Sequence, residues 1–566
     1  MNQNSLLVSD TIIYERVINM KKTSNIFRLI STFLVAVLLL QTGVVGFAAN
    51  VQEKKPVDEK VVETYYDGES LITSEITELR EESVKHFSLE DGANLAVVYP
   101  EPVHYLSGDS WKNIDNSLVL KNSITDKSGN PVYSLKASDV DLRIPQDLNN
   151  GNKIEISKNG NTFKMGLYNN GAADSEKAVI RNNIDSGIIV NENATEIEKQ
   201  NTEIIKSASN SSKVEYKAAF EGADLEYTVS SSRIKENIVI NEKQDNYEYR
   251  FDINYGNLIP VTNEDGSISF FNSEDDEEAA FLLSAPYMVD ASGEYSDSVE
   301  MSLSENILTV TADSKWINSL GRDFPVKIDP TVTVPSTSFI DSSVKNGLQS
   351  GNTFGSDDTL YSGNGFLNTR RTYMKFTLPN LADNSIILGA WLNITQKNIS
   401  LLFNDDVKYL NLFDLTGLSS WTESSITWNN QPLSTTINGP QTNGTTVITY
   451  LNGQNGSNVS YSFGITSKVK QWYANNNNNG FMISTSNENK YCQPTFYSKE
   501  ASSSKPYATI KYTNNPAQKQ SHLHFFRSLR LNIIRLAAGI SVVGSSTRKI
   551  SAGQERSMRM AITPNF

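Results

Sequence analysis

The chain has 566 residues, of which 38% are hydrophobic and 20% charged, a composition typical of folded globular domains. At roughly 100–200 residues per domain, this length predicts about two to four domains. The net charge of −14 disfavours nucleic acid and anionic membranes as general partners. The single cysteine, Cys492, excludes an intramolecular disulfide.

The N-terminal region carries the pattern of an export signal. Positive residues between 20 and 28 precede the apolar run from Leu29 to Leu40, and Gly46-Phe47-Ala48 places small residues at a cleavage site. This pattern predicts a secretory signal peptide over residues 20–48. A membrane anchor is the alternative, but Gln41 ends the apolar run well short of the ~18–20 residues that a span needs. We therefore expect a secreted or cell-surface protein with no transmembrane segment in the mature chain, and the lack of disulfides fits a Gram-positive surface.

The rest of the chain alternates apolar and polar residues with the period of two that is typical of strands. Examples are Lys213–Ala219, Asp224–Ser230 and Tyr247–Asn254. One helical turn is expected at Ser467–Ala474. The pattern predicts an all-β fold with two or more antiparallel β-sandwich domains after the signal peptide. The predicted segments are a flexible leader (49–61), a β-rich N-terminal region of one or two domains (62–330), a linker (331–337), a second β-sandwich (338–513) and a basic tail (514–566).

The tail differs in kind from the rest of the chain. After residue 516 there are eight Lys or Arg residues and a single acid, Glu555. Such a segment could form a basic amphipathic helix that touches an anionic membrane or wall polymer. The alternative is an unstructured or out-of-frame tail.

A strand over residues 371–378 gives the clearest binding signal. Met374 and Phe376 fall on one face of this strand, which we expect to face the core. The other face carries Arg371, Tyr373 and Lys375. Two cations around an aromatic ring suit a surface that meets an anionic or hydroxyl-rich ligand.

A second binding candidate lies in the strand predicted at residues 386–394. Its even-numbered positions are apolar and form a core face, so Trp391 points to the opposite side. An outward indole can stack on a sugar ring. Shielding of Trp391 by a neighbouring loop or domain is the alternative.

Residues that could support catalysis are sparse. The four histidines are His86, His104, His522 and His524, so no Ser/Cys–His nucleophile system is indicated for the second sandwich. Paired carboxylates remain possible, because acids are plentiful. Asp341, Asp357 and Asp358 could instead bind Ca²⁺ at the edge of a sandwich. We expect a protein that is not an enzyme and requires no cofactor, with Ca²⁺ as a possible exception.

Several ordered sequence landmarks between residues 338 and 513 resemble the DNRLRE domain, which is also classed as a carbohydrate-binding module family. They are Ser362-Gly363-Asn364, Arg370 to Phe376, Ala390 to Ile394, Trp421-Thr422-Glu423, Ile426 to Pro432, Val469 to Trp472 and Phe496 to Glu500. The resemblance implies a secreted β-sandwich and, in some members, binding of acidic polysaccharide. One departure is Gly464, where the family often has Asp.

The upstream region is similar to the N-terminal region of Gram-positive wall-associated Rhs/YD-repeat proteins. The similarity rests on Val103-His104-Tyr105, Trp111 to Asn116, Phe220 to Tyr227 and Lys235 to Val239. In that family a YD-repeat array and a toxin follow, but the sequence after residue 513 shows neither.

Three functional readings follow from these residues and resemblances. The first is a non-catalytic surface protein that binds polysaccharide or a cell-wall polymer. The second is the scaffold of a truncated toxin-delivery protein. The third is a polysaccharide-degrading enzyme, which the shortage of histidines disfavours.

Overall fold

The computed structural model describes residues 70–168, 175–184, 195–263, 265–276, 278–334, 338–365, 368–401, 409–437, 446–450 and 459–515. The chain divides into two compact units, Met1–Val61 and Val62–Phe566, and every described residue belongs to the second. The expected signal peptide, the leader and all but the first two residues of the tail lie outside the described residues. Within the described part, no helix combines the length and apolar character needed to cross a membrane.

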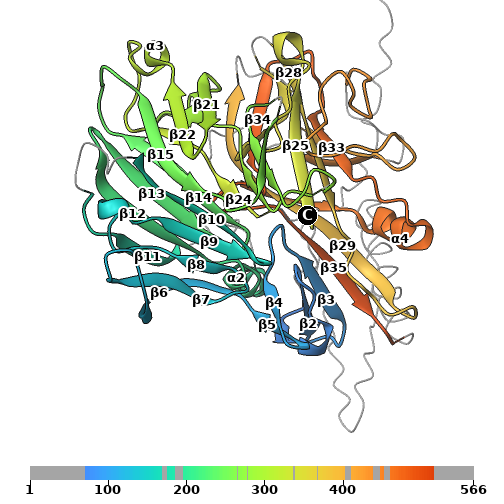
Figure 1. The fold of residues 1–566 in the computed structure, drawn as a ribbon. Coiled ribbons are helices and arrows are strands. Elements are labelled where there is room, and N and C mark those ends of the chain that lie inside the picture. The colour runs from blue at the N-terminus through green and yellow to red at the C-terminus, as the bar shows by residue number, and fades with distance from the viewer. Residues whose placement is uncertain are drawn as a thin grey trace, which may run out of the picture. The chain divides into compact units, whose positions relative to one another are not determined.

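The largest sheet joins strands from the two ends of the described chain (Figure 1). Strand β3 pairs antiparallel with β35, from Asn94 opposite Tyr512 to Val98 opposite Ala508. The main path of this sheet runs β1 (Ile72–Glu75), β2 (Val84–Leu89), β3 (Asn94–Val98), β35 (Tyr507–Thr513), β29 (Ile386–Leu401), β34 (Cys492–Tyr497), β27 (Gly363–Asn364), β28 (Thr369–Phe376), β33 (Phe481–Thr485), β30 (Tyr409–Asp414) and β31 (Thr446–Tyr450). Off this path, β25 (Phe339–Lys345) pairs with β28, β26 (Thr359–Tyr361) with β34, and β32 (Val459–Gly464) with β29.

Two further sheets are built from the N-terminal region. One runs β21 (Val299–Ser304), β22 (Ile307–Ala312), β15 (Glu248–Asn254), β10 (Asn161–Leu167), β9 (Ile154–Lys158) and β8 (Asp141–Arg143). The other runs β11 (Val179–Ile184), β12 (Ser211–Phe220), β13 (Ala223–Val229), β14 (Arg233–Ile240), β24 (Val332–Thr333), β18 (Phe281–Leu283), β17 (Ile268–Phe271) and β16 (Ile259–Thr262), joined at its side by β19 (Tyr287–Val289), β20 (Tyr295–Ser296) and β23 (Val326–Asp329). Strand β24 lies within the stretch expected to be a linker (331–337) and pairs with β14.

The remaining described elements are two hairpins, three helices and three 3-10 turns. Two hairpins are formed by β4 (His104–Ser107) with β5 (Ser110–Asn113), and by β6 (Asp115–Thr125) with β7 (Pro131–Ala137). The helices are α2 (Glu196–Ser207), α3 (Ser314–Ile317) and α4 (Thr466–Asn475), with 3-10 turns at η1 (Thr77–Leu79), η2 (Asn149–Gly151) and η4 (Gly347–Gln349). Helix α2 begins with a capping box in which Thr195 and Glu198 satisfy each other's backbone amides. The turn expected at 467–474 is confirmed as α4, with Val469 and Trp472 buried.

The described part is therefore all-β with antiparallel sheets, as the alternating pattern predicted. One core packs the two N-terminal sheets together. A second core lies within the C-terminal sandwich, and it includes Val84 and Ala96 from β2 and β3. A third, smaller cluster covers the other side of β2 and β3 and includes Ile205 of α2. The N-terminal strands thus extend the C-terminal sheet and contribute to its core.

Candidate functional site

The strand that carries the predicted binding triad forms as β28, but its second face is not open to solvent. Met374 and Phe376 face the core as predicted. On the other face, Arg371 is 1% and Tyr373 is 0% exposed. Tyr373 packs in an apolar cluster with residues of the 415–437 segment, which covers this face of the sheet. The expectation that Arg371 and Tyr373 form an exposed face is therefore wrong.

The Arg371 guanidinium is fully engaged inside the protein. Its Nε and Nη2 donate to the two carboxylate oxygens of Glu488 at 2.8 and 2.9 Å. Nη1 donates to Gln431 Oε1 at 3.0 Å, and Nη2 also donates to the carbonyl of Thr435 at 2.7 Å. The Tyr373 hydroxyl shares Gln431 as its acceptor. This network fastens the covering segment to β28 and the turn after β33.

The other two predicted binding residues are not fully exposed either. Lys375 is half-buried. Trp391 is only 7% exposed, so the shielding alternative is the one that the structure shows. Its indole lies over Gly389, where an added Cβ would fall 2.1 Å from Trp391 Cη2. The lack of a side chain at position 389 makes room for the ring.

A different surface of the same sandwich is partly exposed. Along β34 the residues alternate between buried and half-buried, with Cys492, Pro494 and Phe496 inward. Gln493, Thr495 and Tyr497 therefore point outward. Register places further polar residues beside them: Ser400 lies opposite Gln493, Asn398 opposite Thr495, and Tyr361 opposite Thr495 on the other side. We call this surface the β34 face, defined by Tyr361, Asn398, Ser400, Gln493, Thr495 and Tyr497.

Two cations lie along the β34 face. Lys397, at the bulge of β29, has Nζ 5.7 Å from the centroid of the Tyr497 ring, and its side chain is 35% exposed. Arg370, on β28, has Cζ 4.6 Å from the centroid of the Tyr361 ring. Asn398 and Ser400 are exposed. The surface thus combines phenol rings, amides and hydroxyls with two positive charges, which is the kind of combination that the sequence predicted around Tyr373.

The predicted Ca²⁺ ligands are not brought together. Asp358 pairs instead with Lys235 at 3.3 Å and Lys397 at 3.2 Å. Asp357 lies 3.8 Å from Lys345, and burial raises the pKa of Asp357 to about 6. Each of these two acids thus has a lysine neighbour. In the described part of the chain, neither lies close enough to Asp341 for the carboxylates to hold a metal ion together.

Asp341 has different acidic neighbours, Glu423 and Glu500. One carboxylate oxygen from each of these residues lies within 4.8 Å of the others. Burial, together with the nearby Glu500 and Glu423, raises the pKa of Asp341 well above its usual range. Burial is also the main cause that raises the pKa of Glu423 to about 8. We call this group the acidic triad.

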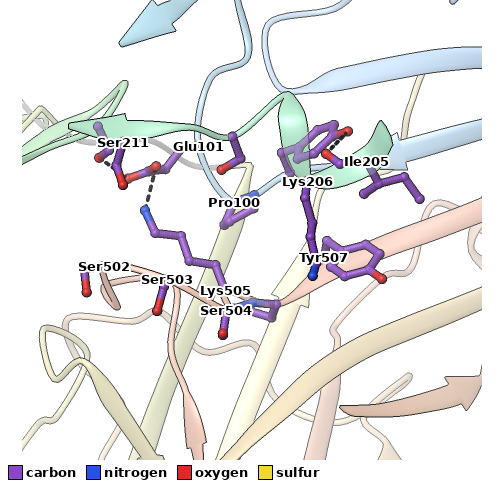
Figure 2. A pocket seen from close by; sticks show the side chains of 14 residues that line it. Pro100, Glu101, Ile205, Lys206, Ser211, Ser502, Ser503, Ser504, Lys505 and Tyr507 are labelled. Atoms are coloured by element: carbon purple, nitrogen blue, oxygen red, sulfur yellow. Dashed lines mark hydrogen bonds and ion pairs between the residues drawn. The ribbon is translucent and has the colours of Figure 1, made fainter. Parts of the chain in front are cut away.

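A small cavity lies between α2, the 99–101 segment and the 502–507 loop (Figure 2). Its walls include Tyr99, Ile205, Tyr507 and several serines, and Lys505 reaches across it to Glu101 at 2.6 Å. Its volume of about 40 Å³ is far below the ~300–1,000 Å³ of typical ligand pockets. This volume suits a few water molecules. The cavity is therefore too small to hold a sugar.

A comparison with protein families identifies a carbohydrate-binding module in the β-sandwich region. Residues 332–512 match the model of carbohydrate-binding module family 96. This range contains β25 to β34 and nearly all of β35, and hence the whole β34 face.

Curated relatives match over a longer part of the chain. The tRNA3(Ser)-specific nuclease WapA of Bacillus spizizenii is 27% identical over 338 residues, which is 56% of this chain and 14% of the relative. The tRNA(Glu)-specific nuclease WapA of Bacillus subtilis subsp. natto is 25% identical over 472 residues, which is 79% of this chain and 18% of the relative. This chain thus matches less than a fifth of the length of either nuclease.

Solved structures give only a weak likeness. The alignment to a Paenibacillus xanthan lyase covers 79% of this chain and 55% of the lyase at 8% identity, with a TM-score of 0.11. This similarity is too low to bear on the fold or the function.

Proposed function

We propose that this protein is secreted, stays at the cell surface and binds an acidic polysaccharide or wall polymer through the β34 face, without catalysing a reaction. The observation that carries this proposal is the position of the β34 face inside the matched carbohydrate-binding module. The signal-peptide pattern over residues 20–48 supports export.

The chemistry of the β34 face fits such a ligand. Phenol rings such as Tyr497 offer an apolar surface with a polar tip, which suits a sugar ring and its hydroxyls. Amide and hydroxyl groups of Asn398 and Thr495 supply both donors and acceptors. The guanidinium of Arg370 and the ammonium of Lys397 suit the carboxylates or phosphates of an anionic polymer.

The test is affinity electrophoresis of the full-length protein in gels that contain alginate, polygalacturonate or neutral dextran. We expect Lys397→Gln combined with Tyr497→Ala to weaken retention on the anionic gels about tenfold, because a charge contact and a ring contact together contribute about 1–2 kcal/mol. The matched control is Lys112→Gln, which removes an exposed lysine of β5. If the double variant has an unchanged circular dichroism spectrum and unchanged retention, the β34 face is not the binding surface.

The same gels address the other two readings. A tRNA gel tests the expected absence of a nucleic-acid partner. A structural scaffold of a toxin-delivery protein would show no retention on any polysaccharide, and sequencing the DNA downstream of codon 516 would reveal a YD-repeat frame. The similarity to a small part of the WapA nucleases favours this second reading over the enzyme.

The enzyme reading has little support in the described side chains. His86 is 0% and His104 is 1% exposed, and both are bound to neighbouring groups, with His86 Nδ1 2.9 Å from the Tyr512 hydroxyl. Cys492 is buried in the sandwich core. Release of reducing ends from the polysaccharide panel would restore the enzyme reading.

A further inference from the structure

The acidic triad collects carboxylates from three separate segments. Asp341 lies on β25, Glu423 follows Trp421 in the segment that covers β28, and Glu500 follows β34. Asp341 shares the core-facing side of the sheet with Phe339 and with Met374, its partner on β28. A charged side chain on an apolar face is costly unless it is paired.

The pairing of these carboxylates is incomplete. Asp341 is 0% exposed, and its Oδ2 accepts a hydrogen bond from the Lys499 amide at 2.9 Å. Its Oδ1 is buried and has no hydrogen-bond partner among the described residues, and the same holds for Glu500 Oε2. Leaving a buried charged acceptor without a partner costs at least as much as a lost hydrogen bond.

Nearby cations compensate only part of the negative charge. Lys499 Nζ contacts Oε1 of Glu423 at 2.9 Å and Oε1 of Glu500 at 2.5 Å, which leaves Glu500 Oε2 free. The second cation, Arg233 of β14, lies 3.7 Å from Glu500 but is shared with Glu101 at 3.5 Å. Three carboxylates therefore face one dedicated positive charge and a part of another.

We propose that Asp341, Glu423 and Glu500 bind a calcium ion. All ligands are carboxylate oxygens, which hard cations such as Ca²⁺ prefer, and three carboxylates supply up to six oxygens when bidentate. A bound ion satisfies the buried oxygens that lack partners. The ion also links β25, the 421–423 segment and the residues after β34 to one another. Arg233 of the N-terminal region lies next to this link.

Gly355 shows that the loop before β26 packs tightly against Glu423. A Cβ at position 355 would lie 2.6 Å from Glu423 Cγ and 2.7 Å from the Glu423 carbonyl oxygen. The absence of a side chain lets the loop before β26 close over Glu423.

The test measures the melting temperature of the full-length protein in EGTA and along a Ca²⁺ titration, with Mg²⁺ as the comparison ion. We expect a saturable rise with Ca²⁺, which is lost in Asp341→Asn and Glu423→Gln. The matched control is Asp358→Asn, which removes a partly exposed carboxylate that pairs with lysines instead. This control should melt lower in both buffers and keep the full calcium-dependent rise.

Two results would overturn the proposal. One is a wild-type melting temperature that does not depend on Ca²⁺; if Asp341→Asn then also has wild-type stability in EGTA, a proton satisfies Asp341. The other is loss of the calcium response in Asp358→Asn alone. Terbium luminescence that Ca²⁺ displaces from the wild type but not from Asp341→Asn would support the site without relying on stability.

Discussion

Removal of the Arg371 side chain should destabilise the sandwich rather than selectively abolish ligand binding. Arg371→Ala leaves Glu488, whose residue is 3% exposed, without its bidentate partner. Breaking a buried ion pair from one side costs about 3–5 kcal/mol, because a charge remains buried without compensation. Glu488 keeps hydrogen bonds from Ser484 and from the Ile437 amide, which places the expected loss toward the lower end of this range.

The assay is urea unfolding of the full-length protein, followed by tryptophan fluorescence and circular dichroism. Arg371→Ala should lower the midpoint of the transition to which the sandwich contributes. The matched variant is Arg371→Met combined with Glu488→Leu, which removes both charges and keeps apolar volume. Replacing a whole buried pair is often neutral or stabilising, so this double variant should recover most of the lost stability.

The same variants separate the two interpretations of Arg371. If Arg371 bound ligand at an exposed surface, the free energy of unfolding of Arg371→Ala would stay within about 0.5 kcal/mol of the wild-type value. It would also lose retention on anionic polysaccharide. That combination would refute the argument from burial. A destabilised Arg371→Ala and a stable, ligand-retaining double variant would support it.

Three further predictions concern other parts of the fold. Gly389→Ala should lower the free energy of unfolding by about 1–3 kcal/mol in denaturant titrations, because the Trp391 ring occupies the space of the new Cβ. Deletion of residues 70–98 should lower the free energy of unfolding by at least about 3–6 kcal/mol, because two buried valines, Val84 and Val98, are lost from the core of the sandwich. A deletion variant as stable as the full chain would contradict the pairing of β3 with β35. Burial lowers the pKa of Lys345 from 10.5 to about 8. Between pH 8 and 10.5 the unfolded state therefore binds this proton more than the folded state does, so the free energy of unfolding should rise with pH. Relative to Lys345→Met, the rise over this range should reach up to about 3 kcal/mol. A flat difference between the two unfolding curves over this pH range would disprove the last prediction.

The period of two in the sequence predicted several of the strands correctly. Strands predicted at 213–219, 224–230 and 247–254 correspond to β12, β13 and β15. The pattern is reliable here because core packing requires apolar residues at every second position. The same alternation, buried and half-buried, runs through β34 and would have identified Gln493, Thr495 and Tyr497 as outward residues.

The failure at β28 has a specific physical cause. Alternation tells which side chains share a face, but it does not tell what covers that face. The second face of β28 is covered by the 415–437 segment, which is distant in sequence and has little regular structure of its own. Because Arg371 finds Glu488, Gln431 and backbone carbonyls there, a charged residue became compatible with burial. Only tertiary contacts reveal such a partner.

Leu388 shows how a bulge moves a residue off the face that alternation predicts. Ala390, Leu392 and Ile394 face the core as predicted, but the register between β29 and β35 shifts between Ile387 and Gly389. The shift brings Leu388 to the side of the third core cluster. A bulge of this kind cannot be read from the local sequence, because it depends on the partner strand.

The pairing of β3 with β35 determines how the binding proposal should be tested. Within the matched range 332–512, β35 would have an open edge with unpaired backbone groups on the side that β3 occupies. Open edges pair with other chains and promote aggregation. The same truncation removes Val84, Ala96 and Val98 from the core of the sandwich. Retention of an isolated fragment on a polysaccharide gel could therefore reflect aggregation, whereas retention of the full chain reports on the folded β34 face.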